Sequence, residues 1–200
     1  MFVPFKPPDH YSYSYLLGLY LGDGCVAGRR PSKQLVIAMD AGYPELIDEC
    51  WAAMKLVMPD CNVARYKMAY ECVRVVGAST RWPEAFPQHG PGRKHERPIV
   101  LEPWQREIVD AFPQEFLRGL IHSDGCRTIN RFKTKLPSGR VAEYAYPRYF
   151  FSNLSADIRG LFCEYCDRLG IRWTQSNHRN ISVSHRHSVA ALDEFIGPKR

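Results

Sequence analysis

The chain has 200 residues, of which 45% are hydrophobic and 24% are charged, and its formal net charge is +6. This composition excludes an intrinsically disordered chain, and the length suffices for one substantial domain or two small ones. No apolar run reaches the roughly eighteen residues that a membrane span needs, and the positive excess favours an anionic partner such as nucleic acid.

The first half of the chain predicts an alternation of helices and hairpins. A helix is expected to end at Gly24, and a hairpin follows with strands at 25–27 and 34–39. Apolar residues at helical spacing predict a second helix over 44–57. A second hairpin, over 63–70 and 72–76, and a short helix at 82–86 complete this half.

Residues 87–111 are predicted to be a linker. Its first part is basic and rich in Pro and Gly, whereas its second part, from residue 102, has a helical pattern. We therefore expect an N-terminal half at 1–86 and a C-terminal half at 112–200.

The second half predicts the same order of elements after a helix that ends at Gly125. Strands at 128–135 and 141–151 flank a turn at 137–139, and a helix spans 156–169. Short strands at 172–175 and 181–185 and a helix at 188–195 follow. The repeating unit is αββαββα, which indicates a duplicated chain.

The duplication is clearest in two segments that lie half the chain length apart. Residues 16–24 read LLGLYLGDG and residues 117–125 read LRGLIHSDG, and each segment is followed by Cys. Small residues four positions apart share a face of each helix, so we expect the two helices to pack closely. The residues expected at this contact are Gly18, Gly22, Gly119 and Ser123. Gly24 and Gly125 are expected to end the helices as C-cap glycines.

This packing would place Asp23 and Asp124 side by side. Two adjacent carboxylates repel each other, and a divalent cation between them removes the conflict. Oxygen ligands without His or Cys suit Mg²⁺, Mn²⁺ or Ca²⁺. One copy alone favours an ordinary Asp-Gly turn after a buried helix, but two copies in matched contexts favour a shared site.

The two segments resemble the LAGLIDADG motif of homing endonucleases. From about Tyr11 to Lys199 the chain is similar to the compact single-chain members of that family. The stretches PQHGPGRKH, RPIVL and IGPK are similar in particular to free-standing actinobacterial homologues. The motif's sixth position holds Leu21 and His122 instead of Asp, but that acid is not a metal ligand in the family.

The resemblance implies an α+β fold of two pseudo-symmetric αββαββα halves, whose antiparallel sheets form a saddle over double-stranded DNA. It implies a functional monomer that cleaves DNA at a long asymmetric site. It assigns Asp23 and Asp124 to metal binding, and we expect Gly22 and Ser123 beside them to contribute. Mg²⁺ is the expected metal, Mn²⁺ is expected to substitute, and Ca²⁺ is expected to bind without supporting cleavage.

The resemblance also implies two pairs of supporting residues. Asp40 and Asn153, at the end of the second strand of each half, would orient metal-bound water; helix caps or Asx turns explain them equally well. Lys94 and Lys199, after the last helix of each half, would lie near the cut phosphates and stabilise charge or activate water. The alternative for these lysines is an ordinary solvated loop.

Basic and polar side chains in the four hairpins are the candidates for DNA contact, because a two-stranded ribbon fits the major groove. A solvated sheet face is the alternative. The candidates are Arg29, Arg30, Lys33, Arg65, Lys67, Arg74, Arg127, Asn130, Arg131, Lys133, Lys135, Arg140, Arg148, Arg172, Gln175, Asn177 and Arg179.

Two other functions and one other metal site are compatible with parts of the sequence. A DNA-binding transcriptional regulator or an RNA maturase would use the same fold without cutting DNA. A zinc site at Cys163 and Cys166 is disfavoured, because both lie inside an amphipathic helix. The seven cysteines are scattered and no export signal is recognisable, so we expect reduced thiols and a cytoplasmic protein.

Overall fold

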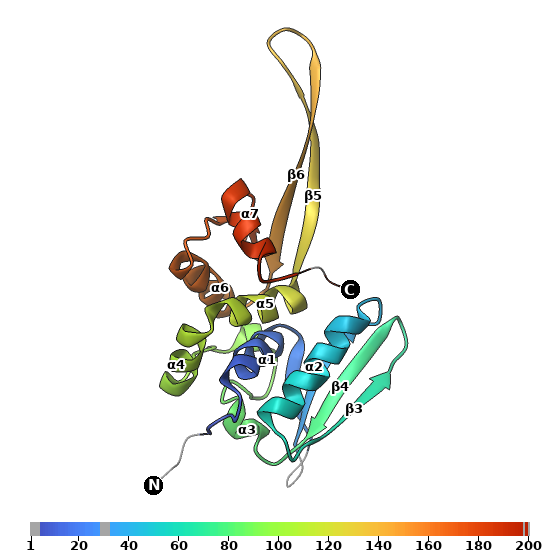
Figure 1. Ribbon diagram of the computed structural model, residues 1–200, viewed down its shortest axis with the longest axis vertical. Helices are drawn as coiled ribbons and strands as arrows, with labels where there is room; N and C mark the ends of the chain where they lie inside the picture. Colours follow the sequence, from blue (N-terminus) through green and yellow to red (C-terminus); the bar gives the residue numbers. More distant parts are fainter. Residues whose placement is uncertain (1–4, 29–32, 198, 200) are drawn as a thin grey trace.

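The structure is a computed structural model that describes residues 5–28, 33–197 and 199. The described residues form two four-stranded antiparallel sheets, with strand orders β1-β2-β4-β3 and β5-β6-β8-β7. Helices α1 and α5 lie side by side at the middle of the molecule, between the two sheets (Figure 1). The predicted α+β fold with two related halves is confirmed.

The first half follows the predicted order closely. Its N-terminal helix begins where Asp9 accepts a hydrogen bond from the backbone N of Ser12 at 2.6 Å. The second helix has the predicted bounds and begins with a proline in its first turn. The elements are α1 (His10–Asp23), β1 (Gly24–Ala27), β2 (Gln34–Asp40), α2 (Pro44–Val57), β3 (Asn62–Lys67), β4 (Cys72–Ala78) and α3 (Trp82–Ala85).

The connecting segment holds a 3-10 turn, η1 (Lys94–Glu96), and the predicted helix, α4 (Pro103–Ala111). A buried chain of hydrogen bonds joins this segment to the first motif helix. Gln105 Nε2 donates to Tyr13 Oη at 2.7 Å, and Tyr13 Oη donates to the carbonyl O of Ala85 at 2.6 Å. The segment is therefore fixed against α1, which matters because it carries Lys94.

The second half repeats the first with one enlarged hairpin. Its elements are α5 (Pro113–Asp124), β5 (Gly125–Lys135), β6 (Val141–Ser152), α6 (Ala156–Arg168), β7 (Thr174–Gln175), β8 (Asn180–Val183) and α7 (Arg186–Asp193). Strand β8 pairs only with residues 149–152 of β6, so the rest of the β5–β6 hairpin has no third strand beside it. It projects from the body as a twisted two-stranded ribbon (Figure 1).

Backbone contact between α1 and α5 holds the two halves together. A Cβ on Gly119 would lie 2.2 Å from the carbonyl O of Tyr15, and one on Gly18 would lie 2.5 Å from the carbonyl O of Phe116. A Cβ on Gly22 would lie 2.1 Å from Ser123 Oγ. Any larger residue at Gly18 or Gly119 would force the helices apart.

Gly24 and Gly125 are the C-cap residues of α1 and α5, as expected, but neither is in the left-handed conformation that is common at this position. Both are extended, with φ of −92° and −113°, and each begins a strand. Their Cβ atoms would lie 2.6 Å from Tyr20 Cα and 2.7 Å from Ile121 Cα. Glycine is needed there because the chain turns directly from helix into strand against its own last turn.

Among the helices of the described residues, none combines the length and the apolar content that crossing a membrane requires.

The helix contact gives the first prediction. Gly119→Ala should lower the free energy of unfolding by about 3 kcal/mol or more, because the new methyl meets backbone that cannot rotate away. Gly160→Ala is the matched control, since Gly160 lies inside α6 with no atom within 4 Å of its Cβ position. It should stabilise the protein by roughly 0.5–1 kcal/mol. Urea denaturation of both variants measures this, and equal effects would contradict the contact.

Candidate functional site

Two carboxylates meet where α1 and α5 end. A Cβ on Gly22 would lie only 3.2 Å from Asp124 Oδ2, so the last turns of the two helices touch beside Asp23. Burial raises the pKa of Asp23, while Lys94 and Lys199 lower it. Burial and then the charge of Asp23 raise the pKa of Asp124 to about 6. The two acids therefore interact directly in a partly dehydrated site.

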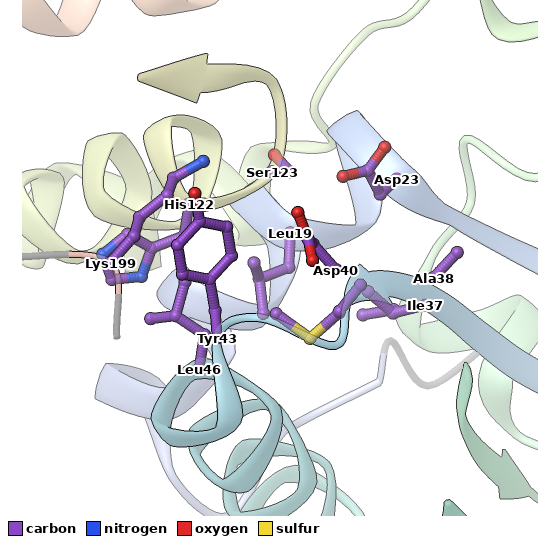
Figure 2. Close-up of a pocket in the computed structure, with 11 residues that line it drawn as sticks. Leu19, Asp23, Ile37, Ala38, Asp40, Tyr43, Leu46, His122, Ser123 and Lys199 are labelled. Carbon is purple, nitrogen blue, oxygen red and sulfur yellow. The ribbon is translucent and has the colours of Figure 1, made fainter. Parts of the chain in front are cut away.

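Asn153 and Asp40 occupy matching Asx turns, but they differ in their contacts with Asp124 and Asp23. Asn153 Oδ1 accepts from the backbone N of Ser155 at 2.7 Å, and Asp40 Oδ1 accepts from the backbone N of Gly42 at 2.8 Å. Asn153 Nδ2 also donates to Asp124 Oδ2 at 2.6 Å. Asn153 thus orients one acid, whereas Asp40 lines the same pocket as Asp23 (Figure 2).

Lys94 lies at the end of α1. Its Nζ donates to the carbonyl oxygens of Tyr20, Leu21 and Gly22 at 2.5, 2.8 and 2.7 Å. A cation suits this position because the last carbonyls of a helix lack partners and carry its negative dipole end. Burial lowers the pKa of Lys94 to about 8, although Asp124 and Asp23 oppose that shift.

Lys199 takes a related place in the other half. Its Nζ donates to the carbonyl O of Gly125 at 2.5 Å, directly after α5. Burial lowers its pKa, and Cys126, Asp23 and Asp124 raise it. Figure 2 shows Lys199 with His122 at one end of a cavity of about 180 Å³ and Asp23 with Asp40 at the other.

His122 holds the C-terminal segment that carries Lys199. Its Nε2 lies 3.0 Å from the carbonyl O of Ile196, and its Nδ1 lies 3.0 Å from Tyr15 Oη. Burial lowers its pKa to about 3, so the ring is neutral near neutral pH. A neutral ring that donates to Ile196 and accepts from Tyr15 satisfies both contacts. The sequence showed His122 only as a departure from the motif, and its structural role was missed.

Arg118 is a second residue whose role the sequence analysis missed. It forms ion pairs with Glu49 of α2 and Glu115 of α5, and its guanidinium lies 4.7 Å from the ring centroid of Tyr15. It thereby ties α5 to the first half. A signal was available, because a cation within a helix expected to be buried needs a carboxylate partner.

The acid pair is the site's candidate for a divalent cation. The described residues contain no group of three or more His, Cys, Asp or Glu that could hold a metal. Mg²⁺ commonly binds through one or two carboxylates and completes its shell with water and substrate phosphate. The Gly22 carbonyl O already accepts from Lys94, but a carbonyl has a second lone pair. Asp23 and Asp124 thus fit a cation shared with a phosphate.

A groove of about 340 Å³ lies on the other side of the acid pair. Its lining includes Lys94 and Asp124, together with Asn153, His95 and Arg179. The sequence analysis placed Arg179 among the DNA-contacting residues, and the structure brings it to this groove. It did not identify His95, which follows Lys94 directly.

The register of the strands separates two faces of each sheet. Side chains alternate along a strand, so residues in register with the buried Ile37 and Phe151 face the helices. We call the opposite side the open face. In the first sheet it carries Cys25, Gln34, Val36, Ala38, Asn62, Ala64, Tyr66, Arg74 and Val76. In the second it carries Cys126, Thr128, Asn130, Phe132, Tyr144, Tyr146, Arg148, Phe150 and Thr174, together with Ser182, which is buried.

This separation divides the predicted DNA-contacting residues between two faces. Arg74, Asn130 and Arg148 lie on the open face. Arg65, Lys67, Arg127, Arg131, Lys133, Lys135 and Gln175 have the opposite parity. Lys33, Arg140, Arg172, Asn177 and Arg179 lie outside the strands, and Arg29 and Arg30 lie outside the described residues.

Several of the helix-side cations are already paired. Arg65 pairs with Asp48 and lies 5.5 Å from the ring centroid of Trp51, both on α2. Arg127 makes two bonds to Asp193 of α7, at 2.8 and 2.9 Å. Lys133 pairs with Glu143 across the ribbon. Phosphate contact by these three cations would compete with these carboxylates.

No family model matches the sequence, and neither does any curated protein. Solved structures do match. One is the LAGLIDADG meganuclease I-AabMI bound to uncleaved DNA, at a TM-score of 0.57 and 12% identity, over 94% of this chain and 82% of that one. Another is I-DmoI in complex with DNA and Ca, at a TM-score of 0.59 and 16% identity, over 94% and 91%.

A third match is full-length DUF199/WhiA from Thermatoga maritima. Its TM-score is 0.55 at 17% identity, over 99% of this chain and 58% of that one. Identities this low show a shared fold. The chain has the LAGLIDADG homing endonuclease fold, as the sequence resemblance implied.

The acid pair predicts an unusual dependence of stability on pH. The pKa of Asp124 rises from 3.8 to about 6, so folding favours its protonated form. Its contribution to stability is full below pH 4 and is lost as the pH rises through 6. Without metal, Asp124→Asn should therefore stabilise the protein above pH 6, by about 1–3 kcal/mol, and the gain should vanish towards pH 4.

Denaturant unfolding at a series of pH values, in EDTA and then with Mg²⁺, measures this. Mg²⁺ should stabilise the wild-type protein more than the variant, because the ion binds the ionised acid. An identical pH dependence of both proteins would show that neither burial nor the charge of Asp23 raises the pKa of Asp124.

Proposed function

We propose that this chain, which has the fold of the LAGLIDADG homing endonucleases, is a metal-dependent, site-specific double-strand DNA endonuclease. The observation that carries the proposal is the contact of the two motif helices, which brings Asp23 and Asp124 together beside Lys94 and Lys199. Two unlike open faces flank this centre, so the target would be long and asymmetric. A single chain already contains both halves, so it would act as a monomer.

Asp23 and Asp124 would hold the divalent cation. A bound Mg²⁺ or Mn²⁺ supplies Lewis acidity for phosphodiester hydrolysis. The structures of I-DmoI with DNA and Ca and with DNA and Mn support the use of a divalent ion. Asn153 would keep Asp124 in position through its 2.6 Å bond, leaving the other carboxylate oxygen for the ion.

Lys94 and Lys199 would attract and position the phosphodiester. Both are held by carbonyl oxygens at the ends of α1 and α5, so neither must be ordered when DNA arrives. A fixed positive charge aimed at a developing negative charge stabilises the transition state. Lys94 is the more firmly held of the two, with three such bonds.

The second candidate is a DNA-binding regulator that does not cut. The match to DUF199/WhiA, whose description names no nuclease, favours keeping this candidate. The acid pair argues for cleavage, since two partly buried carboxylates are costly to keep together unless a cation uses them.

Salt dependence tests the DNA-binding part of the proposal. If about four phosphates are contacted by cations, affinity should fall roughly a hundredfold between 50 and 200 mM salt, because each contact releases a condensed counterion. Fluorescence anisotropy with a labelled duplex measures the slope. An affinity that stays constant over this range would contradict contact between the cations and the backbone.

Substitution of the acids tests cleavage. Asp23→Asn and Asp124→Asn should each reduce cutting of both strands by a hundredfold or more, because the shared cation loses charge, whereas DNA binding should persist. Lys94→Ala should cost less activity, but it removes three hydrogen bonds to helix carbonyls and should cost about 1–3 kcal/mol of stability.

Asp60→Asn is the matched control, since this exposed acid lies in the loop after α2 and its loss changes the charge equally. It should leave cleavage unchanged. The assay uses a library of duplex sites with Mg²⁺, Mn²⁺ or EDTA. If the wild-type protein binds a defined site but cuts neither strand with either metal, the protein is a binding protein on a nuclease scaffold.

A further inference from the structure

The two open faces have different chemistry at equivalent positions. In the first sheet, pairing across all four strands places Cys25, Val36, Val76 and Ala64 in one row. The equivalent row of the second sheet is Cys126, Phe150, Ser182 and Thr174. The first row is entirely apolar or weakly polar, whereas the second has two hydroxyls, of which that of Thr174 is exposed and that of Ser182 is buried.

The apolar row is not part of the protein's core. Val36, Val76 and Ala64 are half-buried and Cys25 is exposed, and none of them belongs to the hydrophobic cluster that the helices cover. Ala38 extends this surface in the next row, where its neighbour across the sheet is the exposed Arg74. The molecule thus presents a row of small aliphatic side chains on this face. Arg74 and the exposed Tyr66 border the row on one side, and the exposed Gln34 and Asn62 border it on the other.

The position of the row limits what can cover it. Strand β1 begins at Gly24, directly after Asp23, and Cys25 is its first open-face residue. A duplex whose phosphate reaches the acid pair would therefore run over this row. The bordering Arg74 matches the negative charge of a phosphate backbone, which favours nucleic acid as the occupant.

Aliphatic side chains recognise one feature of a base edge. They have no hydrogen-bond donor or acceptor, and the only apolar group in the major groove is the C5 methyl of thymine. A cytosine amino group or a guanine carbonyl pressed against them would lose its water without a replacement partner. On the basis of the proposed function, we infer that the first sheet selects a thymine-containing half-site through the methyl groups of its bases.

The second sheet provides an internal contrast. The guanidinium carbon of Arg148 lies over the ring of Phe150, 4.9 Å from its centroid, so a positive charge lies next to this apolar side chain. Asn130 and Thr128 continue this open face along β5 with hydrogen-bonding groups, and only farther out on the ribbon do the stacked rings of Phe132, Tyr144 and Tyr146 follow. Next to the acid pair, the half-site over this sheet would be selected through donors and acceptors, so methyl groups near the centre should matter most on the side of the first sheet.

Replacing thymine by uracil tests the inference, because it removes the methyl and nothing else. Duplexes bound by the full-length protein are first selected from a random-sequence library, and each thymine is then replaced in turn. Within one half-site, every contacted thymine should cost about fourfold in affinity. Uracil at every position of both halves with unchanged affinity would overturn the inference.

A double variant identifies the sheet that is responsible. Val36→Ser combined with Val76→Ser should abolish the uracil effect in that half-site and leave the other half-site unchanged. Both side chains lie outside the core, and thermal unfolding verifies that the variant folds. Gln34→Ser is the matched control, because Gln34 is exposed on the same face of β2 and should leave the uracil effect intact.

The outcomes separate this inference from the proposed function. A uracil effect that persists in the double variant would contradict methyl recognition by this row, while the protein remained a DNA-binding one. A wild-type protein that selects no duplex at all would contradict the proposed function, and the inference with it.

Discussion

The close approach of α1 and α5 is the contact on which the rest of the structure depends. At Gly18 and Gly119 the two helices touch through backbone, so their separation does not depend on the rotamer of any side chain. Their buried apolar residues, such as Leu17 and Leu120, stabilise the pair. Two acids half a chain apart in sequence are thereby held together against their mutual repulsion, which by itself would separate them.

This contact concentrates negative charge, and the charge explains the placement of both lysines. Two helix C-termini and two carboxylates converge at one point, and each helix end carries roughly half a negative charge. Lys94, from the connecting segment, donates to carbonyl oxygens at the end of α1. Lys199, from the C-terminal segment, donates to the carbonyl O of Gly125 at the start of β5. The segments after each half's last helix are therefore parts of the site, and His122 and the buried Tyr13–Gln105 chain fix them there.

The sequence predicted most of the fold because its signals were local and repeated. The spacing of apolar residues predicted both ends of α2, and the doubled glycine motif predicted the packing of α1 against α5. The sequence did not predict contacts between residues that are far apart in the chain. Lys94, for example, donates hydrogen bonds to carbonyls more than 70 residues away. At Gly24 the sequence predicted the end of the helix, but it did not show that the constraint is contact with the preceding turn. Side-chain direction in the hairpins required the register, which places Arg65 and Arg127 toward helices and pairs them with Asp48 and Asp193.

The two halves differ most at positions that the contact between α1 and α5 does not constrain. Glycines at the contact cannot change without moving backbone, whereas open-face side chains lie outside the core and can change at little cost in stability. The hairpins have accordingly diverged, from strands of 4 and 7 residues in β1 and β2 to strands of 11 and 12 in β5 and β6. An isolated two-stranded ribbon is only marginally stable, and stacking of Phe132, Tyr144 and Tyr146 across β5 and β6 supplies what a third strand would. If the proposed function holds, a symmetric centre between two such different surfaces would match a DNA site whose two halves also differ.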